Sequence, residues 1–349
     1  MNSGSRLLFA GLVLLSTGAV AQSPTKPSTP ACTAREDAYA TIGGIAQWVT
    51  IAGQSCANPV VLFVHGGPGN PLSPYSSTIY GSWEKDFTLA QWDQRGAGRT
   101  FGRNPASADQ KLTVEQMTRD GIEVAEHLLR RLGKRKLILV ASSWGSVLGV
   151  HMAKARPDLF DAYVGIGQLV SYRDNQSASY RKVLDLARAA GDSATVEKVE
   201  ALGPPPWSNP RNFGILRRST RTYEAKTSAA APESWWKPSP LYATAEALAA
   251  YEAGEEYSYL QFVGTNGDGM LSTVDLPSLG PEFGVPVYLI QGSEDLVTTP
   301  DVAKHYFDSI RAPAKRYILL RETGHDPNSA MLDALLEVLK EIGAKRAAK

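Results

Sequence analysis

The chain has 349 residues, which is long enough to bury a substantial core without a partner. Lys and Arg total 36 against 35 for Asp and Glu, and the resulting net charge of +1 excludes a strong field for steering nucleic acid or an anionic membrane surface. We therefore expect a small-molecule or small-peptide partner and no nucleic acid.

The first residues have the features of a secretory signal. Arg6 precedes an apolar run at 7–15, and small residues stand at Ala19 and Ala21. The run is shorter than the roughly 20 apolar residues that a membrane span needs. We expect a signal peptide at 1–21, a periplasmic or secreted location and no membrane attachment after cleavage. The alternatives are a frayed apolar terminus and a retained anchor.

The segment that follows is rich in Pro, Ser and Thr, so residues 22–36 are expected to form a flexible leader. The chain has 2 cysteines, Cys32 and Cys56, which flank a predicted β-hairpin at 38–51. An oxidising compartment would favour a disulfide between them, and the alternative is a pair of free thiols.

Short apolar runs beyond the hairpin predict buried strands, and most of them are separated by segments with apolar residues at three- and four-residue spacing. This alternation predicts an α/β fold with a mostly parallel sheet and helices on both faces. The predicted strands are 60–64, 87–91, 137–141, 162–166, 285–290 and 317–320, and the predicted helices are 114–132, 146–155, 301–310 and 329–342.

The alternation is interrupted at 171–279, where helical periods combine with several prolines. We predict an inserted helical cap there, between a first core part at 37–170 and a second at 280–349. Such insertions lie where open α/β sheets place their ligand crevice, so the cap is expected to cover the site.

The strand at 137–141 leads through Ser142 and Ser143 into a helix, which is the context of a nucleophile elbow. The tight turn needs small residues two before and two after the serine. Gly145 and Ala141 meet this requirement for Ser143. A nucleophile at Ser142 or Ser146 would place a larger residue at one of these positions.

A serine hydroxyl needs an imidazole base and a carboxylate that orients the base. The order expected for this fold is Ser, then Asp or Glu, then His. Glu294 and Asp295 follow a predicted strand, and His325 follows the next one. The remaining histidines lie in predicted helices or before a glycine run, so His325 is the predicted base, while the acid is either Glu294 or Asp295.

An oxyanion in the transition state needs fixed backbone N–H donors. The N–H of Trp144 directly follows the predicted nucleophile. A second donor is expected from the glycine loop after the strand at 60–64, and we assign it to Gly67. A simple turn is the alternative for this loop.

Three motifs together resemble the prolyl aminopeptidase (proline iminopeptidase) family of the α/β-hydrolase superfamily: HGGPG at 65–69, WDQRGAGRT at 92–100 and SSWGS at 142–146. The resemblance covers about 58–166 and 285–342. It implies a triad of Ser143, Asp295 and His325, with an oxyanion hole at Gly67 and Trp144. It also implies that Asp93 and Arg95 hold loops near the site.

The sequence departs from the family at Ala141 and Ser142, where the family has glycines, and at Thr100, where it has serine. Family members that remove an N-terminal proline bind the substrate's free amine through cap glutamates, but the motif around those glutamates is not found at 171–279. The available candidates for substrate binding are Glu233 and Glu256, with Glu255 beside them.

We therefore predict an exported serine hydrolase that needs no cofactor or metal and forms an acyl-enzyme. The family implies an aminopeptidase that releases N-terminal proline or another small residue. One alternative is an esterase, lactonase or aryl-amidase on small acyl substrates. A second is a binding protein that keeps only the fold.

Overall fold

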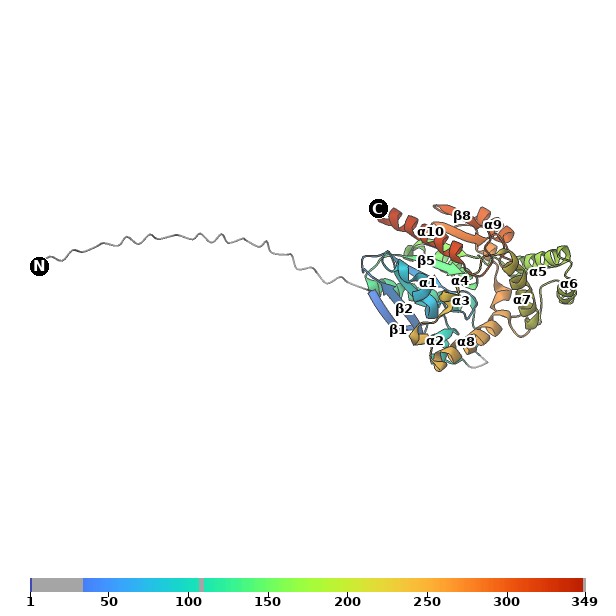
Figure 1. The fold of residues 1–349 in the computed structure, drawn as a ribbon, viewed down its shortest axis with the longest axis horizontal. Helices are drawn as coiled ribbons and strands as arrows, with labels where there is room; N and C mark the ends of the chain where they lie inside the picture. Colours follow the sequence, from blue (N-terminus) through green and yellow to red (C-terminus); the bar gives the residue numbers. More distant parts are fainter. Residues whose placement is uncertain (2–33, 107–109, 348–349) are drawn as a thin grey trace. The chain divides into compact units, whose positions relative to one another are not determined.

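Within the described residues, an eight-stranded sheet has the strand order β1-β2-β4-β3-β5-β6-β7-β8. This computed structural model describes Met1 and residues 34–106 and 110–347 (Figure 1). β2 runs antiparallel to β1 and β4, and the other neighbours are parallel. The strands are β1 (Ala34–Ile42), β2 (Ile45–Gly53), β3 (Val60–Val64), β4 (Thr88–Trp92), β5 (Leu137–Ser142), β6 (Phe160–Ile166), β7 (Val287–Gly292) and β8 (Lys315–Leu320).

Both faces of the central strands are covered. Such strands have continuous apolar runs in place of alternating apolar and polar residues. In β5, Leu137 and Leu139 pack into one apolar core, and Ile138 and Val140 pack into the other. This arrangement confirms the predicted α/β class.

Helices cover both faces of the sheet, as predicted. One core contains side chains of α3 (Val114–Leu132), α4 (Trp144–Ala155) and α9 (Pro300–Ser309). The opposite core contains side chains of α1 (Ser76–Tyr80) and α10 (Ser329–Ala347). The parallel strands between these layers all end at one edge of the sheet, where the predicted site residues lie.

A helical insertion separates β6 from β7, in the range predicted as a cap. Figure 1 shows α5, α6 and α7 grouped together and α8 beside the short α2. The bounds are α2 (Gly98–Arg103), α5 (Tyr172–Ala189), α6 (Ser193–Glu200), α7 (Pro210–Thr227) and α8 (Ala245–Val263). Short 3-10 helices complete the insertion: η4 (Glu233–Trp236), η5 (Pro240–Tyr242), η6 (Met270–Thr273) and η7 (Leu276–Leu279).

The N-terminal boundary differs from the expectation. β1 already begins at Ala34, so the last residues of the predicted 22–36 leader belong to the sheet, where Ala34 is the partner of Gly53. The hairpin extends as far as Ala34 because strand pairing is made by backbone groups and does not require apolar side chains. The predicted signal peptide, the rest of the leader and Cys32 lie outside the described residues.

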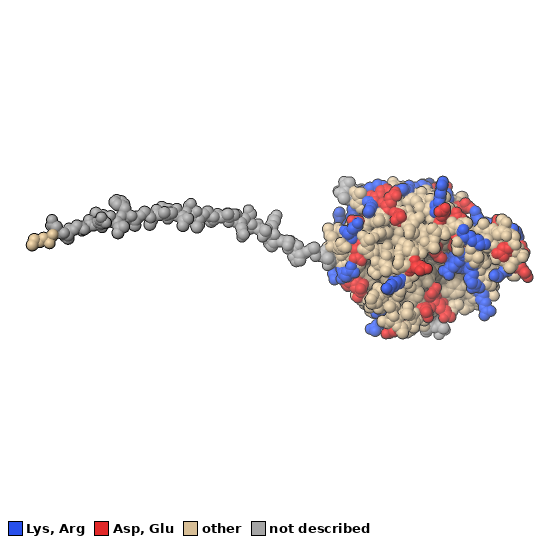
Figure 2. All heavy atoms as spheres, viewed as in Figure 1, with Lys and Arg blue, Asp and Glu red and all other residues tan. Residues whose placement is uncertain are grey.

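The surface carries both signs of charge. Figure 2 shows acidic and basic side chains interspersed over the visible face, with acidic groups gathered over α8 and basic groups beside them over α7. Among the described helices, none has an apolar stretch long enough to cross a bilayer.

Candidate active site

Ser143 stands in the turn between β5 and α4 with φ 50 and ψ −123, a conformation that non-glycine residues rarely adopt. Its N–H donates to the carbonyl of Ile166 at 2.9 Å, and its own carbonyl accepts from the Ser146 hydroxyl at 2.6 Å. The turn therefore presents Ser143 on a backbone fixed by its neighbours, as the predicted elbow requires.

Two glycines make the turn possible. A Cβ on Gly145 would lie 2.3 Å from the carbonyl oxygen of Val64. The close approach of α4 to β3 therefore requires a glycine at this position. A Cβ on Gly149 would lie 2.7 Å from the Cβ of Ala141. The methyl group of Ala141, where the family has glycine, thus occupies space that Gly149 leaves open one turn into the helix.

Ser143, His325 and Asp295 form one hydrogen-bonded chain. The Oγ of Ser143 lies 2.9 Å from Nε2 of His325, and Nδ1 of His325 lies 3.0 Å from Oδ2 of Asp295. Asp295 follows β7 and His325 follows β8, so parallel strands deliver both side chains to the edge at which β5 ends. The side chains of His325 and Asp295 are only 9% and 1% exposed. The structure thus brings together the three residues that the sequence proposed.

The choice between the two adjacent acids follows from the contacts of each. Asp295 touches His325 and also accepts from the N–H of Thr298 at 2.7 Å and from its hydroxyl at 2.6 Å. Glu294 instead accepts from the hydroxyl of Ser293 at 2.9 Å. Only Asp295 is placed to orient the imidazole.

The pKa values of the buried pair are shifted by their mutual attraction. Burial alone would raise the pKa of Asp295, but the charge of His325 and hydrogen bonds from His325 and Thr298 bring it down to about 2. Burial opposes the charged form of His325, yet the charge and hydrogen bond of Asp295 leave its pKa raised above 6.5. Asp295 thus stays ionised over the range in which His325 gains and loses its proton.

The two predicted oxyanion donors belong to segments that adjoin Ser143. A Cβ on Gly66 would be 3.0 Å from Cβ of Ser143, so the glycine loop approaches the serine closely. Trp144 follows the serine as the first residue of α4. Within the described part of the chain, neither the N–H of Gly67 nor that of Trp144 has a hydrogen-bond partner, so both remain available to an incoming group.

Asp93 and Arg95 act as connectors in the loop after β4. Arg95 forms a buried ion pair with Asp120 at 2.8 Å. Asp93 accepts from the hydroxyl of Ser73 and from the N–H of Arg99, and burial raises its pKa to about 6. These contacts fit the loop-holding role that the family resemblance implies.

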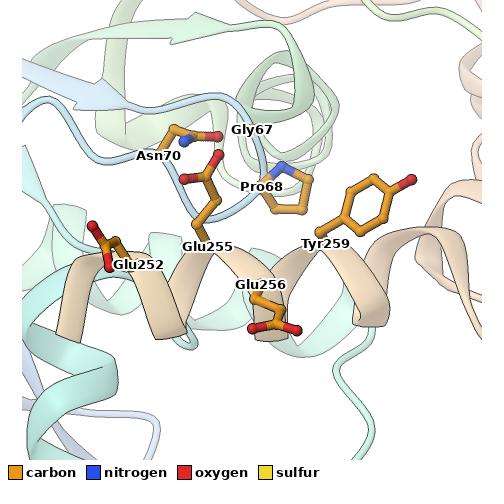
Figure 3. Close-up of a pocket in the computed structure, with 7 residues that line it drawn as sticks. All are labelled: Gly67, Pro68, Asn70, Glu252, Glu255, Glu256 and Tyr259. Atoms are coloured by element: carbon orange, nitrogen blue, oxygen red, sulfur yellow. The ribbon is translucent and has the colours of Figure 1, made fainter. Parts of the chain in front are cut away.

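A pocket of about 310 Å³ opens beside the glycine loop and carries three carboxylates from α8. Figure 3 shows Glu255 extending toward Asn70, while the carboxylate of Glu256 lies on the other side of the helix. The pocket is lined by Gly67, Pro68, Asn70, Glu252, Glu255, Glu256 and Tyr259. Of the predicted glutamates, Glu255 and Glu256 both line the pocket, and the carboxylate of Glu255 lies on the side of α8 that faces the glycine loop.

Glu233, the other predicted substrate contact, lies on η4 with its side chain exposed. It lines neither this pocket nor a second one of about 280 Å³, which shares Glu252 and Glu255 with the first. The second pocket extends along α8 toward Asp93, Arg99 and Tyr251.

Glu224 on α7 is a site residue that the sequence reasoning missed. It is buried, accepts from the N–H of Leu296 at 2.8 Å and pairs with Arg217 at 3.3 Å. Burial raises its pKa, and the charge of nearby His325 opposes that effect. A signal was present in the sequence, because Glu224 falls on the apolar face of its helix with Phe213 and Leu216.

The chain is similar to known proteins in sequence and in fold. The family model described as alpha/beta hydrolase fold matches residues 59–329. The probable aminopeptidase YbaC of Bacillus subtilis is 29% identical over 302 residues, covering 82% of this chain and 89% of that protein. A probable proline iminopeptidase of Streptomyces coelicolor is 25% identical over 298 residues, covering 81% and 88%. The crystal structure of a proline iminopeptidase from Mycobacterium smegmatis superposes with a TM-score of 0.60 at 19% identity, covering 90% of this chain and 100% of that one.

Proposed function

The chain belongs to the alpha/beta hydrolase fold family, and on that premise we propose that it is a serine hydrolase that releases N-terminal residues from small peptides through an acyl-enzyme on Ser143. The observation that carries this proposal is the hydrogen-bonded chain Ser143–His325–Asp295, together with a carboxylate-lined pocket beside the glycine loop.

The first half-reaction follows from the contacts of Ser143. His325 in its neutral form takes the hydroxyl proton across 2.9 Å as the oxygen attacks the substrate carbonyl carbon. Asp295 holds the imidazole in the tautomer with the proton on Nδ1 and stabilises the imidazolium. The N–H groups of Gly67 and Trp144 are the donors for the oxyanion.

The first half-reaction ends when His325 gives its proton to the departing amine, so that the C–N bond breaks and the acyl-enzyme remains. The second half-reaction releases the acyl group. Water enters, His325 takes one of its protons, and the resulting hydroxide attacks the ester carbonyl. The acid product leaves when Ser143 recovers its proton from His325.

The preference for an N-terminal residue is supported by the pocket. A peptide's free α-amine is a cation near neutral pH, and a charge-assisted hydrogen bond to a carboxylate is among the stronger polar contacts. Glu255 extends toward Asn70 in the glycine loop, and Gly66 of the same loop lies close to Ser143, so we propose that a bound amine lies on the glycine-loop side of the site. The relatives named aminopeptidase and proline iminopeptidase point to the same substrate class.

The test is a substrate panel of Pro- and Ala-nitroanilides with a free amine, the same compounds N-acetylated, and p-nitrophenyl esters of short acids. We expect the free-amine anilides to turn over and Ser143→Ala to lose at least about 10⁴-fold in kcat. Ser142→Ala is the matched control and stays close to wild type. Turnover of esters alone would identify an acyl hydrolase without amine recognition.

Amine recognition is tested in the same panel. Glu255→Gln removes the charge and should cut the preference for free over acetylated amines by about 10- to 100-fold. Glu246→Gln, which changes an exposed residue of α8 that lines neither pocket, should leave the preference unchanged. An unchanged preference in Glu255→Gln would exclude Glu255 as the amine-binding group.

A further inference from the structure

His65, the first residue after β3, is buried at 3% exposure and engages both of its ring nitrogens. Nε2 lies 3.2 Å from the backbone nitrogen of Gln94, and Nδ1 lies 2.8 Å from the carbonyl oxygen of Gly66. A backbone N–H can only donate and a carbonyl oxygen can only accept. These two contacts therefore assign the ring proton to Nδ1 and make the imidazole neutral.

The bond to Gly66 fixes the direction of a neighbouring donor. The carbonyl of Gly66 and the N–H of Gly67 belong to one planar trans peptide, in which the two groups point in opposite directions. The carbonyl faces the imidazole of His65, so the N–H of Gly67 faces away from it. This is the N–H that lacks a partner among the described residues.

A peptide between two glycines has little to keep it from flipping. Rotation of this peptide changes ψ of Gly66 and φ of Gly67, and glycine tolerates values on both sides of zero. Gly67 already has φ +106. The loop cannot gain rigidity from a side chain at Gly66, because a Cβ there would be 3.0 Å from Cβ of Ser143. An external anchor is needed, and the hydrogen bond from His65 is such an anchor.

Gln94 connects this anchor to the second donor. Its Nε2 donates to the carbonyl of His65 at 2.8 Å, and its Oε1 accepts from the indole N–H of Trp144 at 3.2 Å. Gln94 and Trp144 are each 1% exposed, so the contacts are shielded from water. One amide thus joins the glycine loop to the residue that supplies the other N–H.

We infer that His65 is a positioning residue that holds the Gly66–Gly67 peptide in the orientation that presents the Gly67 N–H to the oxyanion, with Gln94 fixing the imidazole tautomer. The inference rests on the proposed serine-hydrolase function. His65 touches neither the substrate nor the reacting atoms, and its effect is exerted through the peptide.

Two variants of similar shape distinguish the contributions of the two ring nitrogens of His65. In His65→Asn the amide nitrogen can stand where Nδ1 stands and donate to Gly66, whereas in His65→Gln the amide lies near Nε2 and the bond to Gly66 is lost. The rate of Ser143 labelling by a fluorophosphonate and kcat on the best panel substrate are measured, normalised to the folded fraction from near-ultraviolet circular dichroism.

We expect His65→Gln to lose about 10²-fold in labelling rate and kcat with KM little changed, which is the loss seen when an oxyanion donor is removed. His65→Asn should retain most of the activity. Equal losses in both variants, or a loss confined to KM, would overturn the inference while leaving the serine-hydrolase proposal intact. Failure of the wild type to label at Ser143 would overturn both.

A second measurement is made on the wild-type protein. In wild-type protein labelled with ¹⁵N-histidine, the His65 signals should show a proton on Nδ1 and none on Nε2 near neutral pH. A neutral ring protonated on Nε2 would contradict the contacts with Gln94 and Gly66 and overturn the inference.

Discussion

Asp295 has more hydrogen-bond donors around it than a carboxylate needs for orienting one imidazole. The N–H groups of Val297 and Thr298, the Thr298 hydroxyl and the Gln291 amide all point at it. Burial raises the pKa of Asp295, but the charge of His325, its hydrogen bond and the hydrogen bonds from Thr298 outweigh burial and bring the pKa to about 2. His325 consequently has a permanent negative neighbour.

This electrostatic pairing predicts the pH dependence of Asp295→Asn. In wild type, kcat/KM should fall on the acid side as His325 takes up a proton, with a midpoint above 6.5 because Asp295 raises the pKa of His325. The variant lacks that charge, so the midpoint should move to lower pH, and the plateau should drop by about 10⁴-fold. Rate profiles and the NMR titration of His325 measure both effects.

Glu294→Gln is the control for this change, because it removes a neighbouring carboxylate that hydrogen-bonds Ser293 rather than His325. Its profile should match wild type. A midpoint that stays in place in Asp295→Asn would show that another group raises the pKa of His325.

Individual site residues differ in how far the sequence could identify them. Ser143 and His325 followed from the elbow and from chain order, because local spacing and strand ends carry that information. Glu255 was one of several candidate glutamates and Glu224 was not proposed, since their proximity to the site depends on how α7 and α8 pack over the sheet. Helical glutamates are usually solvated. Glu224 carried one local signal, its place on the apolar face of its helix, but that signal does not show that it lies near His325.

At the scale of elements, the junction of β3, β5 and α4 depends on close backbone approach. A Cβ on Gly145 would lie 2.3 Å from the carbonyl of Val64 and 2.5 Å from that of His65. These are backbone atoms of a central strand and its end, so they have no room to move aside. The elbow, the glycine loop and the helix start therefore form one packed unit.

Gly145→Ala should for this reason lower the free energy of unfolding by about 3 kcal/mol and slow the labelling of Ser143. Gly343→Ala on α10 is the matched control, because no atom lies closer than 3.9 Å to its added Cβ. The control should be neutral or gain up to about 1 kcal/mol from helix propensity. Urea unfolding compares the two, and equal stability of both variants would contradict the steric argument.

The buried strands after the hairpin were predictable to within two residues because burial on both faces leaves uninterrupted apolar runs, as in β3 (Val60–Val64). Helix α3 matched its predicted range, whereas α10 continues past 342 and the long helices of the insertion were predicted only as a cap. The start of β1 was not predictable, since residues 34–36 have no apolar run and join the sheet through backbone pairing and through ion pairs of Arg35 and Glu36 with distant residues. The 3-10 helices of the insertion escaped prediction as well. Segments as short as η4 (Glu233–Trp236) have too few turns for a period and depend on tertiary contacts.

At the scale of the whole molecule, we propose that the protein is exported, with cleavage after Ala21, and that a Cys32–Cys56 disulfide ties the N-terminal end of β1 to the loop after β2. The proposal relies on the signal-like sequence at 1–21 and on the cysteine positions around the hairpin. Mass spectrometry of the exported protein should find Gln22 as its first residue.

The disulfide prediction is tested by stability. Closing the chain between Cys32 and Cys56 should stabilise the fold by about 3 kcal/mol. Cys32→Ser, Cys56→Ser and the double variant should therefore unfold at the same lower urea concentration, and a reductant should bring wild type to that value. A reductant that leaves wild type unchanged would show that no stabilising bridge forms.

The separation of Ser143 and His325 by 182 positions has a consequence for biosynthesis. Their hydrogen bond depends on β7 and β8 joining the sheet beside β6. On the proposed mechanism, a nascent chain that has emerged only as far as α4 contains Ser143 but lacks His325, so it cannot hydrolyse the peptides around it. Activity then requires the last strand of the sheet, β8, which places His325 beside Ser143.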